Sequence, residues 1–501
     1  MSETRQKAEN DKLMQARIYE QEKWKQSNPE MRPVFHVTPP VGWMNDPNGF
    51  SLYQGEYHLF FQYHPYSTVW GPMHWGHCKT KDFIRWEQLP CALAPDRDYD
   101  GQGCFSGSAV EQDGKHILMY TSVQERELED GTRQIRQTQS IAVGDGVNYV
   151  KAAQNPVIGA GVLPEGSSLE DFRDPRIWKE KDTFYAVIGS RSADGSGQIA
   201  LFSSVDALQW QFERILDRSD NRYGSMWECP DFFRLDQKQV LIVSPQLMQA
   251  EGLEFHNGNN SIYFVGKYGE ESREFLRGKA HTIDYGLDFY APQTVETKDG
   301  RRVMIGWLQS WDNYLTPETA DWSGVMTVPR ELSLKGERLV QTPVRELDQY
   351  HTQEIVYQNI RLEKKDGTVA PEGVRGRVFD MTVELEDYDF GRFEIALAAD
   401  ERNRTSLIYD REMKTLTTDR TYSGLVHDCL CTRSMYVQPH GGKLSLRILM
   451  DKFTLEVFVN GGEQAMSTLI YTRLQADGIC FSCDGSAVFS VKKFGLDPGC
   501  E

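Results

Sequence analysis

Three carboxylic acids stand in unusual surroundings along the first half of the chain. Asp46 lies in WMNDPNG, Asp174 in FRDPR and Glu228 in MWECPDF. A proline follows each acid directly or one residue later and restricts the backbone before it, while aromatic neighbours lower the local dielectric constant. One such stretch alone is more often an ordinary turn, and Asn-Asp-Pro-Asn-Gly is a strong turn sequence. Three of them in separate parts of the chain indicate that the acids share a site.

Two carboxylates in different protonation states can cleave a glycosidic bond, one as nucleophile or base and the other as proton donor. Asp46 has a short, amide-rich setting with Asn45 and Asn48 as hydrogen-bond donors, which favours an ionised group. Glu228 follows Trp227 in an apolar stretch, and such a setting keeps a carboxylic acid protonated and suits a general acid. We therefore expect Asp46 to be the nucleophile and Glu228 the acid.

The third acid and several polar-aromatic clusters complete the predicted site. Asp174 follows Arg173 directly, so we expect its carboxylate to stay charged and to grip substrate hydroxyl groups rather than pass protons. A sugar presents hydroxyl groups together with apolar ring faces, which mixed clusters of this kind can contact. The cluster residues are Gln62, Trp70, Trp75, Phe105, Ser106, Trp307 and Trp311. The histidines at 64, 74 and 77 lack the spacing of a helical metal-ligand pair, so we predict no metal site there.

Acids so far apart in sequence can meet only if the fold brings them to one axis. Five short apolar runs recur at intervals of about 55 to 67 residues, a period typical of propeller blades. Each run is rich in β-branched or aromatic residues and too short for a buried helix, so each predicts a buried strand. The runs are YHLFFQY (57–63), HILMYTS (116–122), TFYAVIG (183–189), QVLIVSP (239–245) and RVMIGWL (302–308). We predict an all-β chain whose five-bladed β-propeller, over 30–347, carries the acids in loops at one end of a central funnel.

A second all-β domain is predicted after the propeller. From about residue 370 apolar and polar residues alternate, which predicts strands with one solvated face, and Asn-Gly-Gly at 460–462 predicts a tight turn. Several such strands joined by short turns predict a C-terminal β-sandwich over 366–501. The polar stretch 348–365 is the expected linker, and the charged segment 1–29 is expected to be an N-terminal arm or solvated helix.

Composition excludes several classes of partner. A formal net charge of −18 repels nucleic acid and anionic membranes. No run of 18 apolar residues is present, and the charged N-terminus lacks the apolar segment of a signal peptide. The nine cysteines, an odd number, fit free thiols and a cytoplasmic location. Cys429, Cys431, Cys480 and Cys483 depart from the paired spacing of a zinc site, so we expect no metal there either.

The motifs together resemble those of glycoside hydrolase family 32. WMNDPNG, FSGSAV, FRDP, WECPD, DYGLDFYAPQT, GWLQSW and VPRELSL occur in this order, and LRILMDKFTLEVFVNGGEQAMST extends the likeness into the second domain. The resemblance implies a five-bladed propeller followed by a β-sandwich, and retaining hydrolysis of terminal β-D-fructofuranosides without metal or cofactor. It makes Asp46 the nucleophile that forms a covalent fructosyl-enzyme, Glu228 the general acid/base and Asp174 the transition-state stabiliser. It places sugar contacts at Asn45, Gln62, Trp70, Phe105, Ser106, Arg173 and Trp311.

The substrate stays open at this point. Sucrose, sucrose 6-phosphate and short fructo-oligosaccharides of the kestose or inulin type all end in a fructosyl group. A phosphorylated sugar would need a cation on the glucose side of the scissile bond, for which Arg133, Arg136 and Lys267 are candidates. A fructosyltransferase would use the same three acids, whereas a non-catalytic fructan-binding protein would have lost one, so a hydrolase is favoured. The oligomeric state is also left open by the sequence.

Overall fold

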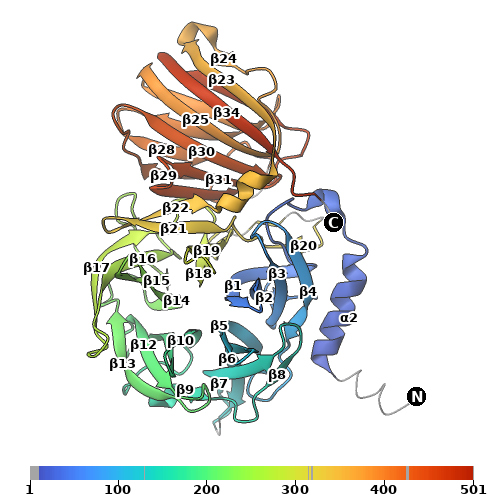
Figure 1. The fold of residues 1–501 in the computed structure, drawn as a ribbon, viewed down its shortest axis with the longest axis vertical. Helices are drawn as coiled ribbons and strands as arrows, with labels where there is room; N and C mark the ends of the chain where they lie inside the picture. The colour runs from blue at the N-terminus through green and yellow to red at the C-terminus, as the bar shows by residue number, and fades with distance from the viewer. Residues whose placement is uncertain (1–10, 129, 314, 317–319, 425–427, 500–501) are drawn as a thin grey trace.

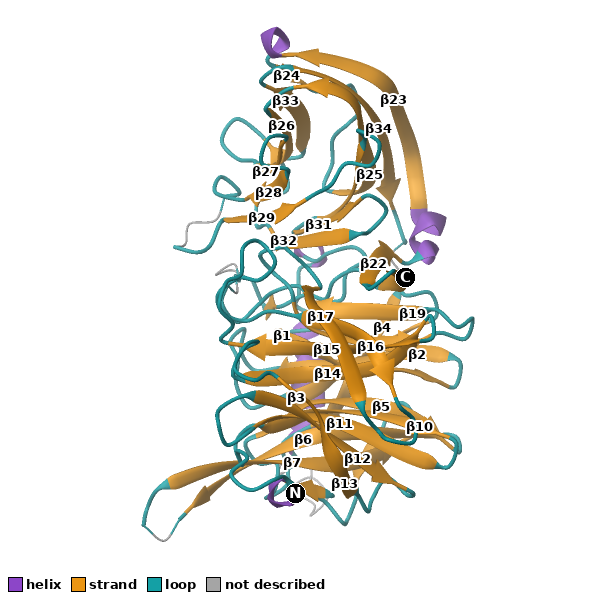
Figure 2. Ribbon diagram, turned by 90° about the vertical axis from the view of Figure 1, so that its left-hand side faces the viewer, coloured by secondary structure: helices purple, strands orange, loops and turns teal. Residues whose placement is uncertain are grey.

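The computed structural model describes residues 11–128, 130–313, 315–316, 320–424 and 428–499 and arranges them in two bodies (Figure 1). The N-terminal body is a ring of sheets around a central axis, and the C-terminal body is a pair of facing sheets (Figure 2). Outside the strands, the described residues form helix α2 (Lys12–Trp24) and the short 3-10 turns η1 (Pro29–Met31), η2 (Ala160–Val162), η3 (Arg345–Tyr350) and η4 (Lys364–Asp366). The all-β prediction is confirmed.

The ring consists of five antiparallel blades, each numbered from the axis outward. Blade 1 contains β1 (Gly42–Tyr53), β2 (Glu56–His64), β3 (His74–Thr80) and β4 (Trp86–Leu93), with β20 (Trp322–Ser323) parallel to β1. Blade 2 contains β5 (Gly103–Gln112), β6 (Lys115–Glu127), β7 (Arg133–Gly144) and β8 (Tyr149–Lys151), with β9 (Ile158–Gly159) paired to β7. Blade 3 contains β10 (Phe172–Glu180), β11 (Thr183–Arg191), β12 (Gly197–Ser204) and β13 (Gln211–Arg218). Blade 4 contains β14 (Met226–Leu235), β15 (Lys238–Gln246), β16 (Ile262–Tyr268) and β17 (Phe275–Thr282). Blade 5 contains β18 (Tyr290–Glu296), β19 (Arg302–Trp307), β21 (Arg330–Lys335) and β22 (Arg338–Pro343).

The five apolar runs of the sequence form the second strand of each blade, namely β2, β6, β11, β15 and β19. Neighbouring blades cover both faces of these strands. In the apolar cluster between blades 3 and 4, for example, Val187 and Leu201 pack with Leu241 and Phe264. A strand buried on both faces needs a continuous apolar run rather than alternation, which is why the repeat is visible in the sequence. The predicted five-bladed propeller is confirmed.

The innermost strands surround the axis (Figure 1), and each contains a register shift near its first residues. The shifts lie between Met44 and Pro47 in β1, Phe105 and Gly107 in β5, Arg173 and Arg176 in β10, Glu228 and Asp231 in β14, and Tyr290 and Gln293 in β18. The expectation that Asp46 lies in a turn is therefore wrong, because Asn-Asp-Pro-Asn-Gly belongs to strand β1. Proline cannot donate to a ladder hydrogen bond, and a bulge is a position where a strand accommodates it and re-aims a side chain.

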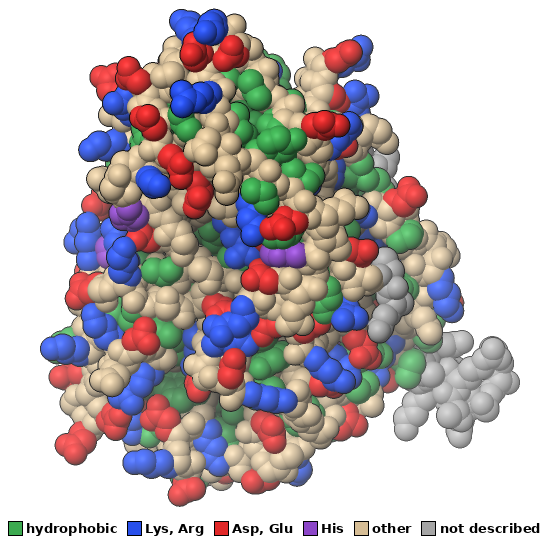
Figure 3. Space-filling model, turned by 45° about the horizontal axis from the view of Figure 1, so that its top comes forward, with side chains coloured by type: hydrophobic (Ala, Val, Ile, Leu, Met, Phe, Trp, Pro, Cys, Tyr) green, Lys and Arg blue, Asp and Glu red, His purple; other side chains and the backbone are tan. Residues whose placement is uncertain are grey.

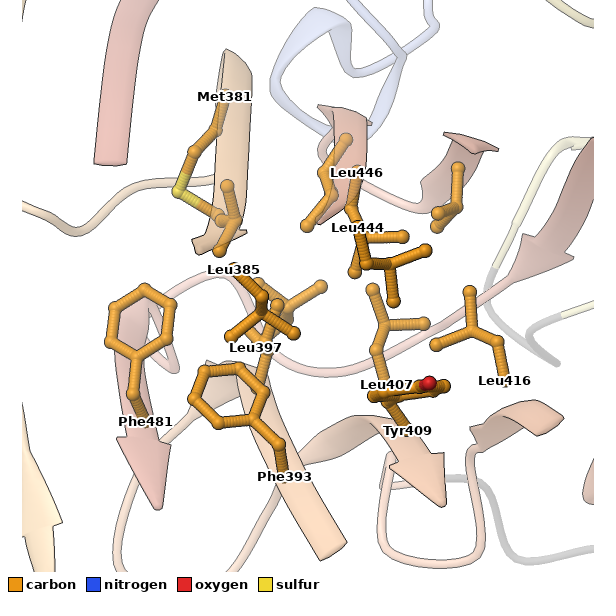
Figure 4. Close-up of a cluster of buried hydrophobic side chains, with 14 of the residues drawn as sticks. Met381, Leu385, Phe393, Leu397, Leu407, Tyr409, Leu416, Leu444, Leu446 and Phe481 are labelled. Atoms are coloured by element: carbon orange, nitrogen blue, oxygen red, sulfur yellow. The ribbon is translucent and has the colours of Figure 1, made fainter. Parts of the chain in front are cut away.

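The C-terminal body is a sandwich of two six-stranded sheets. One sheet runs β23 (His351–Glu363), β34 (Ser486–Leu496), β25 (Val378–Asp389), β30 (Leu444–Asp451), β31 (Thr454–Val459) and β32 (Gln464–Leu469). The other runs β24 (Thr368–Val369), β33 (Gly478–Cys483), β26 (Arg392–Ala399), β27 (Thr405–Asp410), β28 (Thr415–Asp419) and β29 (Thr432–Tyr436). Their inner faces share one apolar core, where Met381, Leu385 and Leu446 meet Phe393, Leu407 and Phe481 (Figure 4). The predicted sandwich is confirmed.

Two expectations for the segments that flank the domains need correction. The stretch 348–365 is not a linker, because most of it is β23, paired with β34 along its whole length at the edge of a sheet. An edge strand is half solvated, which explains its polar composition. Of the expected arm 1–29, residues 1–10 lie outside the described part. Helix α2 is not simply solvated, since it buries Ala16 and Glu20, and the Glu20 carboxylate accepts a hydrogen bond from the amide of Cys91.

A buried ionic network joins the two bodies. Arg330 of β21 donates to Glu456 of β31 at 2.5 Å and to Asp284 at 2.9 Å, and all three side chains are inaccessible to solvent. His36 contacts Asp451 at 2.9 Å through Nδ1 and Glu456 at 2.8 Å through Nε2. Buried charges of this kind are costly unless every partner is in place, so the network fixes one docking geometry.

The outer surface is mixed in charge. Figure 3 shows acidic and basic side chains interspersed over the visible face. None of the helices in the described ranges has the length and hydropathy that a membrane span requires.

Candidate active site

The three predicted acids lie on the inner strands of blades 1, 3 and 4, at the register shifts, and the structure brings them together. The thiol of Cys229, on β14, lies 3.5 Å from Oδ2 of Asp46 and 3.6 Å from Oδ2 of Asp174. The amide of Cys229 donates to the same Asp174 oxygen at 3.0 Å. Glu228 is the residue before Cys229, so all three acids meet at the axis. Asp174 and Cys229 have φ of +65° and +47°, a conformation that turns their side chains out of the regular strand alternation.

Asp46 is almost fully buried and accepts a hydrogen bond from Ser106 Oγ at 2.7 Å through Oδ2. Burial, followed by the charge of Glu228, raises the pKa of Asp46, and hydrogen bonds from Ser106, Asn45 and Cys229 oppose this rise. Asn48, expected as a donor to Asp46, instead accepts from the amide of Gly107 at 3.3 Å and so ties blade 1 to blade 2. Oδ1 of Asp46 accepts no hydrogen bond from the described residues.

Both oxygens of Glu228 are held by polar groups of other blades. Arg173 donates from Nε to Oε1 at 2.9 Å, and the Tyr290 hydroxyl donates to Oε2 at 2.7 Å. The apolar setting expected from its sequence neighbours is therefore wrong, because Trp227 is buried in the cluster between blades 3 and 4. Trp227 and Glu228 are consecutive in the regular part of β14 and point to opposite faces, so Trp227 does not form the surroundings of Glu228.

Asp174 also differs from expectation. Burial raises its pKa to about 7, with further rises from the charges of Glu228 and Asp46, and Arg173 only partly opposes them. Arg173 divides its donors between Glu228 and Asp171, the latter at 2.9 Å, instead of pairing with Asp174 alone. Three carboxylates this close cannot all stay ionised near neutral pH, so the site holds a proton ready for transfer.

The predicted sugar contacts fall into two groups, a buried polar residue and several aromatic side chains that lie nearer the surface. Gln62 is buried and donates to the carbonyl of Cys104 at 3.0 Å. Phe105, partly exposed, lies edge-on to Trp70 at 5.9 Å, and Trp70 is 49% exposed at the rim. Trp311 stacks on Trp43 with ring centroids 6.1 Å apart. Two further candidates, Trp75 and Trp307, are fully buried, so they pack behind the other aromatic side chains and are not accessible to a sugar.

Two site residues were missed by sequence reasoning. Tyr290 contacts Glu228 directly, and Gln137 accepts from Nη1 of Arg173 at 3.2 Å. A signal for Tyr290 exists, because Tyr290-Ala291-Pro292 stands at the register shift of its blade as Arg173-Asp174-Pro175 and Glu228-Cys229-Pro230 do in theirs. Ala291 also has a positive φ, +50°. Tyr290 is not a carboxylic acid, so its equivalence in position to Arg173 and Glu228 is not visible from the carboxylic acids alone.

The three candidate cations for a phosphate group lie in different places. The β6–β7 hairpin continues past the first residue of β5, at the end of the ring where the inner strands begin, and carries Arg133 and Arg136 there. Arg133 is 3.5 Å from Glu125, and Arg136 donates to Gln134 at 2.9 Å. Lys267 is exposed near the opposite end of blade 4, where β16 pairs with the outermost strand, so it cannot face the site.

Comparison with known proteins agrees with this geometry. The chain is 37% identical over 487 residues to a sucrose-6-phosphate hydrolase of Zymomonas mobilis, covering 93% of this chain and 92% of the relative. It is 36% identical to a raffinose invertase of Escherichia coli, covering 91% and 93%. A β-fructofuranosidase structure from Bombyx mori superposes with a TM-score of 0.83 at 34% identity, covering 97% of this chain and 98% of that one.

The family models divide the chain at the same place as the fold. The model described as the glycosyl hydrolases family 32 N-terminal domain matches residues 36–343, which form the propeller, and the family 32 C-terminal model matches 346–495, which form the sandwich. This chain, a glycosidase, belongs to glycoside hydrolase family 32.

Proposed function

We propose that this enzyme hydrolyses terminal β-D-fructofuranosides, with sucrose or sucrose 6-phosphate as its substrate. The observation that carries the proposal is the convergence of Asp46, Asp174 and Glu228 at the axis, with Glu228 gripped by Arg173 and Tyr290. Relatives that cover nine-tenths of the chain bear the names sucrose-6-phosphate hydrolase and raffinose invertase, which support the same substrate class.

In the first step Asp46 attacks and Glu228 gives up a proton. The carboxylate of Asp46, oriented by the hydrogen bond from Ser106 to its Oδ2, bonds to the anomeric carbon C2 of the fructosyl unit. As that bond forms, the C2–O bond to the leaving sugar breaks and its oxygen takes the proton of Glu228. This step requires the proton of the site to be on Glu228, so that ionised Asp174 grips ring hydroxyl groups and stabilises the positive charge that develops on the ring.

In the second step water releases the fructose. Ionised Glu228, held by Arg173 and Tyr290, accepts a proton from water as the oxygen of that water attacks C2. The bond to Asp46 breaks, Asp46 regains its charge and fructose leaves with retained configuration. The same three acids would serve transfer to a sugar acceptor, so product analysis at high sucrose concentration separates hydrolysis from transfer.

Substitution of the acids tests the assignment. Asp46→Ala and Glu228→Ala should each lower kcat by at least about 10³-fold, and Asp206→Ala, at an exposed turn of blade 3, is the control. Azide added to the Asp46→Ala variant should restore turnover and give fructosyl azide of inverted configuration. Activity like that of wild type in either acid variant, or a product of retained configuration, would show that the roles are wrong.

Arg136 is our proposed contact for a 6-phosphate group. It lies on the hairpin beside the site, is half-buried and donates to a neutral glutamine, whereas Arg133 is exposed beside Glu125. The ratio of kcat/KM for sucrose 6-phosphate to that for sucrose should fall at least about 10-fold in Arg136→Ala. Lys267→Ala, at the far end of blade 4, should leave the ratio unchanged. An unchanged ratio in Arg136→Ala would contradict this assignment. Measuring kcat/KM for 1-kestose as well compares fructo-oligosaccharides with the two sucrose substrates.

We also propose that the enzyme acts in the reducing cytoplasm. The eight cysteines of the described residues are free, and the Sγ atoms of Cys429 and Cys431 lie 3.9 Å apart without a disulfide. Free thiols of this kind are typical of a reducing compartment. Fractionation of the source cells should find the activity inside them, and activity confined to the medium would contradict the proposal.

A further inference from the structure

The hydroxyl group of Tyr290 can serve both protonation states of Glu228. It lies 2.7 Å from Oε2 of Glu228 and 3.0 Å from the backbone oxygen of Ser244, in a fully buried position. A phenol has one proton, so it donates to one of these acceptors at a time. When Glu228 is ionised the hydroxyl donates to it. When Glu228 is protonated, the hydroxyl group accepts a hydrogen bond from Glu228 and donates its own hydrogen bond to the backbone oxygen of Ser244 instead.

The segment before Tyr290, residues 283–289, is held by the sandwich. Strand β32 is the last strand of its sheet, and its open edge faces this segment. The amide of Tyr285 donates to the carbonyl of Ala465 at 2.8 Å, and the amide of Asp288 donates to the carbonyl of Ser467 at 3.1 Å. A Cβ on Gly286 would lie 2.0 Å from the carbonyl oxygen of Ser467, so only glycine allows this approach. The propeller segment therefore occupies the edge of a sandwich sheet.

Two buried aspartates lock the segment in place. Asp284 accepts from the amide and the hydroxyl of Ser467 at 2.8 and 2.7 Å. Asp288 accepts from the amide of Leu469 at 2.8 Å and from Arg420 at 2.5 Å. Asp288 is only two residues before Tyr290, so a shift of its backbone is passed to Tyr290 over about 7 Å of chain.

We propose that the sandwich domain positions the general acid/base, because β32 and Arg420 fix residues 283–289 and thereby hold Tyr290 against Glu228. This inference rests on the role proposed above for Glu228. Tyr290 and Asp288 are positioning residues, since they act through Glu228 and touch no substrate. The sandwich thus contributes to proton transfer without lining the site.

Several other charged or titratable groups surround these positions. Those close to Glu228 are Arg173 and Asp174 on β10, Asp46 on β1, Cys229 on β14 and Tyr290 on β18. Those facing Asp288 are Arg420, Arg433 and Tyr471 of the sandwich. A change in the pH dependence of one variant could come from any of these groups, so the contribution of Tyr290 is identified by comparing several variants.

The test compares isosteric substitutions of two buried aspartates, each paired with an arginine of the sandwich. Asp288→Asn weakens the lock on residues 283–289. Asp380→Asn is the matched control, because Asp380 is also a buried aspartate paired with an arginine, but its partners Arg447 and His351, at 2.6 and 2.9 Å, lie within the sandwich. For each variant, and for Tyr290→Phe, the pH dependence of kcat/KM is measured with sucrose and with 4-nitrophenyl β-D-fructofuranoside, whose leaving group needs no proton.

The expected results follow from the loss of a donor to ionised Glu228. Tyr290→Phe should move the alkaline limb of the sucrose profile up by about one pH unit and lower kcat/KM for sucrose about 10-fold. The aryl fructoside should change by less than about 2-fold. Asp288→Asn should move the alkaline limb in the same direction by a smaller amount. In the double variant with Tyr290→Phe it should cause no further shift of the limb. Asp380→Asn should lower the unfolding midpoint and leave the limb in place.

Two results would overturn the inference. One is an equal limb position in Asp288→Asn and Asp380→Asn, and this comparison stands even if Tyr290→Phe fails to fold. The other is a limb shift from Asp288→Asn that persists in full when Tyr290 is replaced. Failure of the underlying role is seen separately, because Glu228→Gln would then retain turnover of sucrose like that of wild type.

Discussion

Replacement of His36 should change how the stability of the protein depends on pH. Burial alone would lower the pKa of His36, but hydrogen bonds and charges from Asp451 and Glu456 outweigh it and raise the pKa to about 9. The rise from 6.5 corresponds to about 3 kcal/mol of stabilisation of the folded state, at 1.36 kcal/mol for each pH unit. Because the folded pKa is the higher one, this stability is fully present below pH 6.5 and is lost as pH rises to about 9.

Denaturation by urea, followed by tryptophan fluorescence, measures the effect. Ten of the eleven tryptophans lie in the propeller and the other, Trp24, in helix α2, so fluorescence reports mainly on the propeller. The difference in unfolding free energy between wild type and His36→Gln should shrink by about 3 kcal/mol between pH 6.5 and 9.5. His74→Gln is the control, because burial lowers the pKa of His74 to about 4 and leaves it neutral over this range. A difference that stays constant with pH in His36→Gln would refute the argument that the buried imidazole is charged.

Three further predictions concern single side chains. Ser106→Ala removes the donor to Asp46 and should lower kcat/KM for sucrose about 10- to 100-fold in steady-state kinetics, and a loss under 2-fold would contradict it. Arg173→Lys cannot reach Glu228 and Asp171 together, so kcat/KM should fall at least about 10-fold, and full activity would show that one contact suffices. Burial raises the pKa of Glu20 to about 7, so stability falls as pH rises from 4.5 to 7. In calorimetry, Glu20→Gln should unfold at a higher temperature than wild type at pH 8 but not at pH 4. An equal increase in unfolding temperature at both pH values would contradict the raised pKa of Glu20.

The sequence predicts the strands buried on both faces and hides those at an edge. Runs such as 239–245 are apolar throughout because two neighbouring blades cover them, and that signal repeats with the blades. Strand β23 carries no such signal, since it is an edge strand with largely exposed side chains, and its composition equals that of a linker. Asn-Asp-Pro-Asn-Gly satisfies the local needs of a turn and of a bulge alike, so only pairing with β2 decides between them.

The acids could be found from the sequence, but their surroundings could not. Each acid is marked by a nearby proline, a local feature. The partners of Glu228 come from β10 and β18, 55 and 62 residues away, and nothing beside Glu228 in the sequence indicates them. The state of Asp174 likewise depends on the charges of Glu228 and Asp46, which the adjacent Arg173 does not cancel.

The parallel pairing of β1 with β20 has a consequence for biosynthesis. Gly42 and Trp43 pair with Trp322 and Ser323, and the amide of Met326 donates to the carbonyl of Val37, so the ring is sealed by residues made near the end of the propeller. Until the ribosome has extended the chain past this point, the inner edge of β1 at Gly42 and Trp43 has no strand partner. The ring can therefore close only after almost the whole propeller has been synthesised, which makes this closure a late event in the folding of the nascent chain.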